Sequence, residues 1–148
     1  NKGMRAVIQR VKHTTLSVDG RLVSEIPFGL AVYLGVKVGD TDEMPAAMAK
    51  KIAALRIFED ENGKMNLSVG DVGGEIMLIS QFTLYGDCSH GNRPSFIAAE
   101  RPERANALYE TTRDELISRG MTVKTGIFGA DMKIEQFNDG PVTIIYEI

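Results

Sequence analysis

The chain lacks most of the features that identify common classes of enzyme and membrane protein. It has one cysteine, Cys88, which excludes an internal disulfide and a cysteine-rich zinc site and fits a reducing compartment. No stretch approaches the ~18 apolar residues of a membrane span, and the amino end lacks the layout of a secretory signal. The Walker phosphate loop, the dinucleotide fingerprint, H-E-x-x-H and G-x-S-x-G are all missing. We therefore expect a cytoplasmic protein without a metal, a cofactor or a membrane partner.

The size and charge of the chain limit the number of domains and the class of partner. The chain has 148 residues, 43% of them hydrophobic, which suits one domain over residues 4–148. Residues 1–3 precede Met4 and look like the remnant of a cloning tag. With 17 basic and 20 acidic side chains the net charge is -3. This charge argues against DNA as a partner and against coating long nucleic-acid backbones, but it is compatible with gripping one RNA end.

The periodicity of apolar residues predicts strands, a helix, strands, a helix and strands again. Helices are expected at 42–55 and 103–119, the second closed by Gly120. Strands are expected at 4–11, on either side of Asp19-Gly20 within 16–26, at 29–36, around Glu61-Asn62-Gly63, and at 75–84, 121–128, 132–137 and 142–148. This order predicts an α+β fold in which a mixed, largely antiparallel sheet curls like a barrel around about two main helices.

The last strand raises two expectations. Residues 142–148, "VTIIYEI", are too apolar for a bare edge, so the strand is either central or paired with another subunit, and we favour a homodimer. Gly140 and Pro141 precede it directly, although proline cannot donate to a ladder and glycine weakens a strand. Such a pair belongs at a strand's first residue or a sharp bend. A cis bond there would aim two neighbouring carbonyls the same way.

Polar residues end the apolar strand expected at 75–84. Ser80, Gln81 and Thr83 lie in "SQFTLYGD", and strand ends that face a crevice commonly carry binding groups. The other interpretation is that Gln81 and Thr83 form the solvent face of an alternating strand, with Phe82 in the core. This segment alone leaves both interpretations open.

The histidines give weaker candidates. His13 lies in the first strands and His90 in the loop "YGDCSHGNRPSF". A Cys88–His90 nucleophile pair would be two residues apart in one loop, which matches no known geometry. A metal site from Asp87, Cys88 and His90 lacks the rigid scaffold that catalytic zinc requires. We expect no metal site here.

Several segments taken together resemble one family. "SQFTL" (80–84), "NDGPVT" (138–143) and the opening "MRAVIQRV" (4–11) resemble the D-aminoacyl-tRNA deacylase (D-tyrosyl-tRNA deacylase) family. The resemblance extends to "GNRPSF" (91–96) and "TGIFGADM" (125–132), and so covers essentially the whole chain. Two motifs in the right order and separation are far more specific than one.

The resemblance implies a hydrolase acting on the aminoacylated 3′ end of tRNA. Members of this family cleave the ester that joins a D-amino acid, or glycine mischarged on alanine tRNA, to the terminal adenosine, and they spare L-aminoacyl-tRNA. They are homodimers with active sites at the subunit interface. By this resemblance a cis Gly140–Pro141 peptide would project its carbonyls into the partner's pocket. The pocket residues that it would face are Ser80, Gln81, Phe82 and Thr83.

The resemblance also implies roles for three other side chains. Arg10 would pack beneath the Gly-Pro turn and fix it, since its five donors suit carbonyl anchoring. Phe82 would lie against the terminal adenosine or shape the pocket floor, and Met132 would line the adenine pocket. The competing interpretations are a solvated strand arginine, a core phenylalanine and a packing methionine.

The catalytic step leaves more than one hypothesis open. Thr83 has no evident base, so we favour hydrolysis assisted by the ribose hydroxyl, with the N–H groups of Gln81 and Phe82 as an oxyanion hole. Two other functions stay open: a non-catalytic module that binds RNA 3′ ends with the same pocket, and a small-molecule esterase with Thr83 or Cys88 as nucleophile.

Overall fold

Two long strands organise the sheet of this protein. In the computed structural model, which describes residues 2–148, β1 (Arg5–Val18) and β8 (Met132–Glu147) pair antiparallel along almost their whole length. The other side of β1 pairs with β3 (Gly29–Gly35) through its first half and with β2 (Arg21–Ile26) through its second. Beyond β3 the sheet continues in parallel through β6 (Glu75–Ser80) and β7 (Val123–Thr125).

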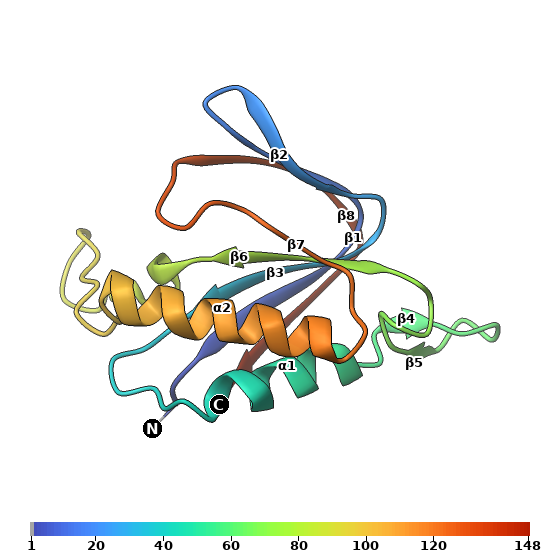
Figure 1. Cartoon of the computed structure of the whole chain (residues 1–148), viewed down its shortest axis with the longest axis horizontal. Coiled ribbons are helices and arrows are strands. Elements are labelled where there is room, and N and C mark those ends of the chain that lie inside the picture. Colours follow the sequence, from blue (N-terminus) through green and yellow to red (C-terminus); the bar gives the residue numbers. More distant parts are fainter. Residues whose placement is uncertain (1) are drawn as a thin grey trace.

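The sheet curls until its two ends approach one another. Its strand order is β2-β1-β3-β6-β7, with β8 on the free side of β1. The Ser24 hydroxyl of β2 donates to the Thr125 carbonyl of β7, and Lys124 reaches the Glu25 carbonyl at 3.5 Å. Figure 1 shows β2 and the start of β8 bent back over β6. The prediction of a mixed, largely antiparallel, barrel-like sheet is confirmed.

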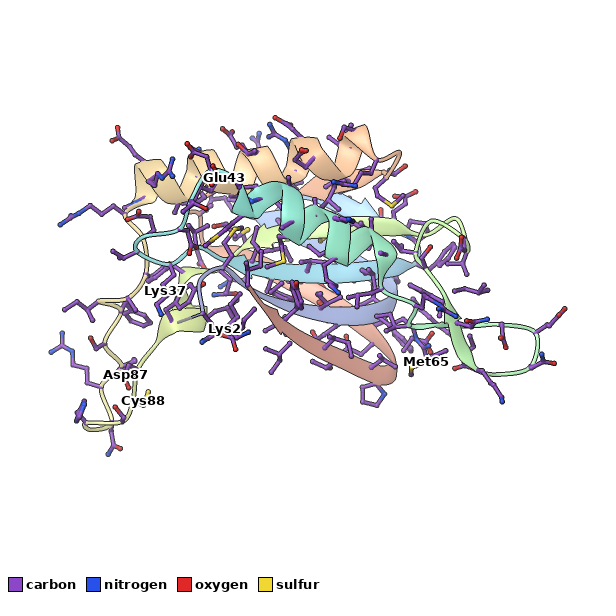
Figure 2. All side chains as sticks on the ribbon, turned by 90° about the horizontal axis from the view of Figure 1, so that it is seen from below. Lys2, Lys37, Glu43, Met65, Asp87 and Cys88 are labelled. Atoms are coloured by element: carbon purple, nitrogen blue, oxygen red, sulfur yellow. The ribbon has the colours of Figure 1, made fainter. Side chains whose placement is uncertain are left out.

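Two helices cover one face of this sheet, as Figures 1 and 2 both show. They are α1 (Met44–Ala54) and α2 (Pro102–Ser118), close to the predicted ranges. Their buried residues recur at helical spacing, such as Met48 and Ile52 on α1. With Ile8, Val32 and Leu78 of the sheet these residues form the main core.

A second core fills the opposite face of the sheet. It contains Leu16, Ile26, Ala31, Met77 and Ile79, all of them buried. The curled halves of β1, β2 and β8 supply its outer wall. Neighbouring residues of a strand point to opposite faces, so β3 and β6 contribute to both cores and read as continuous apolar runs, as predicted for 29–36.

The strand boundaries differ from the predicted ones in several places. β1 is one strand, and β8 is one strand where two were predicted, at 132–137 and 142–148. Both continue because register shifts absorb the extra residues without ending the ladder. The strand predicted at 75–84 ends at Ser80 and is followed by a 3₁₀ turn, η1 (Phe82–Tyr85). The hairpin predicted around 61–63 is formed by β4 (Phe58–Glu59) and β5 (Met65–Leu67).

Gly3 is hydrogen-bonded to the rest of the fold, although the sequence predicts a domain over residues 4–148. Its N–H donates to the Ile148 carbonyl at 2.5 Å, and its carbonyl accepts from the Tyr85 hydroxyl at 2.7 Å. A Cβ on Gly3 would lie 2.4 Å from Oδ1 of Asp40. A side chain at this position would therefore require the Asp40 side chain to shift.

We expect Gly29→Ala to destabilise the fold much more than Gly20→Ala. Both glycines have positive φ, at +141° and +78°, and an alanine near the left-handed region, as at Gly20, costs about 1–2 kcal/mol. A Cβ on Gly29 would also lie 1.9 Å from the Glu75 carbonyl oxygen of the neighbouring parallel strand, whereas nothing lies within 4 Å of one on Gly20. Urea unfolding should show a loss well above ~2 kcal/mol for Gly29→Ala alone. Equal losses would contradict the close approach of β3 and β6.

Candidate active site

A cleft of about 950 Å³ opens where β6 ends. Its wall includes the last residues of β6, the start of η1, the loop that precedes α2 and the chain that leads into β8. The cleft brings together four of the residues predicted from the sequence: Ser80, Gln81, Phe82 and Met132. It also includes aromatic residues that were not predicted, Phe96 and Phe128.

The backbone at the end of β6 turns sharply and leaves two N–H groups free. The Gln81 N–H donates to the Leu34 carbonyl of β3 at 2.8 Å, so the expectation that it forms half of an oxyanion hole is wrong. The N–H groups of Phe82 and Thr83, the first two residues of η1, have no acceptor within residues 2–148, as is usual for the first N–H groups of a helix. The turn therefore offers two neighbouring backbone donors to a ligand, the N–H groups of Phe82 and Thr83.

The Thr83 hydroxyl has an amide as its side-chain partner. Nε2 of Gln81 donates to Oγ1 of Thr83, and both side chains belong to the turn that follows β6. An amide N–H cannot accept a proton, and no carboxylate, imidazole or amine of residues 2–148 is hydrogen-bonded to this hydroxyl. The geometry gives Thr83 no general base and therefore does not favour it as a nucleophile.

Phe82 is a cleft residue and not a core residue. Its side chain is 55% exposed and packs edge to face against Phe96, with ring centroids 5.2 Å apart. The interpretation that Phe82 fills the core is wrong, because the chain leaves the strand before this residue. Phe96 comes from the segment "GNRPSF", and an aromatic residue that ends a polar loop was the signal available in the sequence. Together the two rings, inclined at 69° to one another, form an apolar part of the cleft wall.

The Gly-Pro pair occupies a bulge in the middle of β8. Gln9 pairs with Thr143 and Val11 with Asn138, so residues 139–142 face the single residue between them on β1. The Gly140–Pro141 peptide bond is cis, and both residues are exposed. The expectation of a sharp bend fits this geometry, although the bend lies inside a strand and not at its start.

Arg10 is the residue opposite this bulge, and it is 6% exposed. Its Nε donates to the Asp139 carbonyl at 3.2 Å, directly before the Gly-Pro pair. Nη1 donates to the Ile57 carbonyl at 2.9 Å, and Nη2 lies 3.4 Å from a Glu59 carboxylate oxygen. The interpretation of Arg10 as a solvated strand residue is therefore wrong, and its side chain ties the bulge to the chain that follows α1.

The two predicted motifs do not meet within one chain. Neither Gly140 nor Pro141 contributes to the wall of the cleft, and neither does Arg10. Met132, the first residue of the same strand β8, does line the cleft. A substrate held in the cleft of one chain would therefore touch the Gly-Pro carbonyls only if they came from another copy.

The remaining candidates lie away from the cleft. Figure 2 shows Asp87 and Cys88 on a loop that projects from the body of the protein, and Cys88 is exposed. Hydrogen bonds from Ser89 lower the pKa of the Asp87 carboxyl. His13 is paired with Glu25 at 2.6 Å in the curled part of the sheet. Between residues 2 and 148, no group of three or more His, Cys, Asp or Glu side chains is arranged to hold a metal ion.

Within the described part of the chain, neither helix is long and apolar enough to cross a membrane.

Comparison with known proteins gives matches along almost the whole chain. The family model described as D-Tyr-tRNA(Tyr) deacylase matches residues 7–147. A D-aminoacyl-tRNA deacylase of Geobacillus sp. (strain WCH70) is 56% identical over 144 residues, which are 97% of this chain and 95% of the relative. A D-aminoacyl-tRNA deacylase of Lactobacillus delbrueckii subsp. bulgaricus (strain ATCC BAA-365 / Lb-18) is 52% identical over 98% of this chain and 100% of the relative.

Solved structures have the same fold. A protein described as c-Myc DNA Unwinding Element Binding Protein superposes with a TM-score of 0.91 and 41% identity, over 97% of this chain and 98% of that one. A probable eukaryotic D-amino acid tRNA deacylase superposes with a TM-score of 0.87 over 98% and 99%. At 18% identity, this second likeness concerns the fold alone.

Proposed function

We propose, because this chain belongs to the D-Tyr-tRNA(Tyr) deacylase family, that it hydrolyses the ester bond of D-aminoacyl-tRNA and releases a free D-amino acid and tRNA. The observation that carries the proposal is the match along residues 7–147 together with the cleft at the "SQFTL" segment. The relatives named for this activity are more than half identical to this chain.

The active site is completed by a second copy of the chain. Gly140 and Pro141 are exposed on β8 and do not line the cleft of their own chain, which supports a role in the cleft of a partner. Phe137 and Ile145 flank them on the same strand, and these apolar side chains are 68% and 66% exposed. Burial of such side chains favours association. In the resulting homodimer each cleft would receive the Gly-Pro carbonyls of the other subunit.

This arrangement explains how handedness would be sorted. Main-chain carbonyls of Gly140 and Pro141 accept hydrogen bonds from the α-ammonium group of the substrate. With that group held, a D side chain points toward open space, whereas an L side chain meets the wall. Glycine has no side chain to be rejected, so glycyl-tRNA is also a substrate. Rejection through a clash and an unmade polar contact discriminates more strongly than one methyl group in an apolar pocket.

Hydrolysis proceeds without a protein nucleophile. Water adds to the ester carbonyl carbon, the Phe82 N–H stabilises the developing oxyanion, and the bond to the ribose oxygen breaks. The neighbouring ribose hydroxyl positions the water, and the proton that the water loses ends on the departing ribose oxygen. Ser80 and the Gln81 amide orient the substrate, and Phe82 with Met132 holds the terminal adenosine. Stacking on one aromatic ring is worth about 1–3 kcal/mol.

The name of one structural neighbour describes a DNA-binding protein, but this chain offers little support for that function. Its net charge is -3, and an extended DNA interface requires many basic side chains. Lys124 and Lys133, on the curled part of the sheet, are paired with Glu75 at 3.7 Å and Asp131 at 3.3 Å. The short aminoacylated end of a tRNA is better matched to the cleft.

Hydrolysis of matched substrates tests the proposal directly. With D-tyrosyl-, L-tyrosyl- and glycyl-tRNA, we expect release of D-tyrosine and glycine, and L-tyrosine release at least about 100-fold slower. D-Tyrosine ethyl ester should be a poor substrate, because it lacks the nucleotide that the cleft holds. Binding of all three tRNAs without hydrolysis would indicate an RNA 3′-end module, and rapid turnover of the small ester would indicate a simple esterase.

Mixed dimers test whether two chains form each site. One chain carries Phe82→Ala and the other Pro141→Ala, with different tags for purification of the heterodimer. If the sites are shared, one of its two sites is unaltered, and we expect about half of the wild-type rate. In the matched control, one chain carries both substitutions and its partner none, so every shared site is damaged. Sites confined to one chain would reverse these two results.

Thr83→Ala separates substrate-assisted hydrolysis from nucleophilic catalysis. Because the geometry gives Thr83 no base, we expect the variant to keep kcat for D-tyrosyl-tRNA within about threefold of the wild type. Loss of a true nucleophile costs far more, on the order of 1,000-fold or greater. Single-turnover kinetics of the two proteins make the comparison, and a collapse of the rate to background would establish the nucleophile.

A further inference from the structure

Arg5, the first residue of β1, is hydrogen-bonded to the turn at the candidate active site. It pairs in register with Gly35 on β3 and Glu147 on β8, and so stands in the middle of the sheet. Its Nη1 donates to the Leu84 carbonyl of η1 at 2.7 Å. Leu84 directly follows the segment Gln81–Thr83. Within residues 2–148, Arg5 is the one residue of β1 whose side chain is hydrogen-bonded to η1.

The guanidinium of Arg5 is held in one orientation. Nε and Nη2 donate to the same Glu147 carboxylate oxygen, at 3.0 and 2.9 Å. Because the group is planar and its donors are fixed relative to one another, this fork determines where Nη1 points. The carboxylate therefore aims the remaining donor at the Leu84 carbonyl.

Tyr85 packs against the same guanidinium. The central carbon of the Arg5 guanidinium lies 5.0 Å from the centroid of the Tyr85 ring, and this ring is buried. The Tyr85 hydroxyl lies 2.7 Å from the Gly3 carbonyl and 3.1 Å from that of Gly35. A Cβ on Gly35 would be 2.7 Å from the ring, so there is no room for the ring to move toward β3.

The turn is thus fixed at both ends. At its start the Gln81 N–H is bonded to Leu34, and at its end Arg5 holds the Leu84 carbonyl while Tyr85 is locked in place. The free Phe82 N–H lies between these two anchors. Small displacements of a positioned group of this kind have large effects on rate.

We propose that Arg5 is a positioning residue for deacylation. It fixes the turn so that the Phe82 N–H and the side-chain amide of Gln81 meet the substrate. This inference rests on the proposed function. Arg5 does not touch the substrate and acts only through the backbone of η1. The side chains of Arg5 and Glu147 are 34% and 28% exposed, and partly exposed ion pairs contribute little to stability. Loss of Arg5 should therefore affect catalysis much more than folding.

The test compares Arg5→Met with Arg113→Met. Arg113 lies on α2, is 32% exposed and also pairs with carboxylates, but it is not part of the cleft. We expect kcat for D-tyrosyl-tRNA to fall about 10- to 100-fold in Arg5→Met, with KM within about threefold and a nearly unchanged urea midpoint. Arg5→Lys, which keeps one donor, should recover part of the loss, and Arg113→Met should behave as the wild type.

Amide NMR spectra of the free proteins provide a readout that does not depend on activity. We expect the amide resonances of Phe82 and Thr83 to shift or broaden in Arg5→Met and to stay unchanged in Arg113→Met. Unchanged resonances with wild-type kcat would overturn the inference and leave the proposed function intact. A wild-type protein that does not hydrolyse D-aminoacyl-tRNA would refute the proposed function, while the spectra would still decide whether Arg5 fixes the turn.

Discussion

The pairing of β1 with β8 is the constraint on which the rest of the structure depends. β1 is bonded on both sides, so its position fixes β3 and β2 on one edge and the carboxyl-terminal strand on the other. The ladder is interrupted opposite Arg10, where four residues of β8 face one of β1. After this point the buried side chains of β1 belong to the second core and not to the helix-covered one: Ile8 lies in the first, and Leu16 in the second. One interrupted ladder therefore closes the sheet and creates both cores.

The cleft follows from how β6 ends. β6 is bonded on both sides, because it pairs in parallel with β3 and with β7. The chain therefore leaves the sheet only after the last residue of β6, at the end of the strands. At this edge the chain forms η1, and the curled start of β8 lies opposite, so Phe82 and Met132 face a common space. Ser80 and Gln81 are held here by backbone pairing with Leu34 of β3, so their positions do not depend on a flexible loop. In the proposed mechanism, the chemistry of the site therefore relies on main-chain geometry more than on titrating side chains.

Much of the fold was predictable from local patterns, and the parts that were not depend on pairing. Apolar spacing located α1 and α2, and Asp19-Gly20 located the first hairpin, because these signals are contained in a few neighbouring residues. The continuity of β8 through Gly140 was not predictable, since a bulge is defined by the opposite strand. The same limit applies to the site: the "SQFTL" segment marks the cleft, but the partner of the Gln81 N–H is 47 residues earlier in the chain. The homodimer remains a prediction.

The positions of Arg5 and Arg10 on one strand have a consequence for how this sequence can vary. Arg5 holds the turn at the cleft, and Arg10 holds the bulge, and both are set by the regular rise of β1. An insertion of one residue between them would rotate every later side chain to the opposite face of the sheet. Hairpin tips such as the one after β4 can change in length without this effect. Homologous chains should therefore differ in the length of such tips, while the five-residue spacing from Arg5 to Arg10 allows substitution but no insertion or deletion.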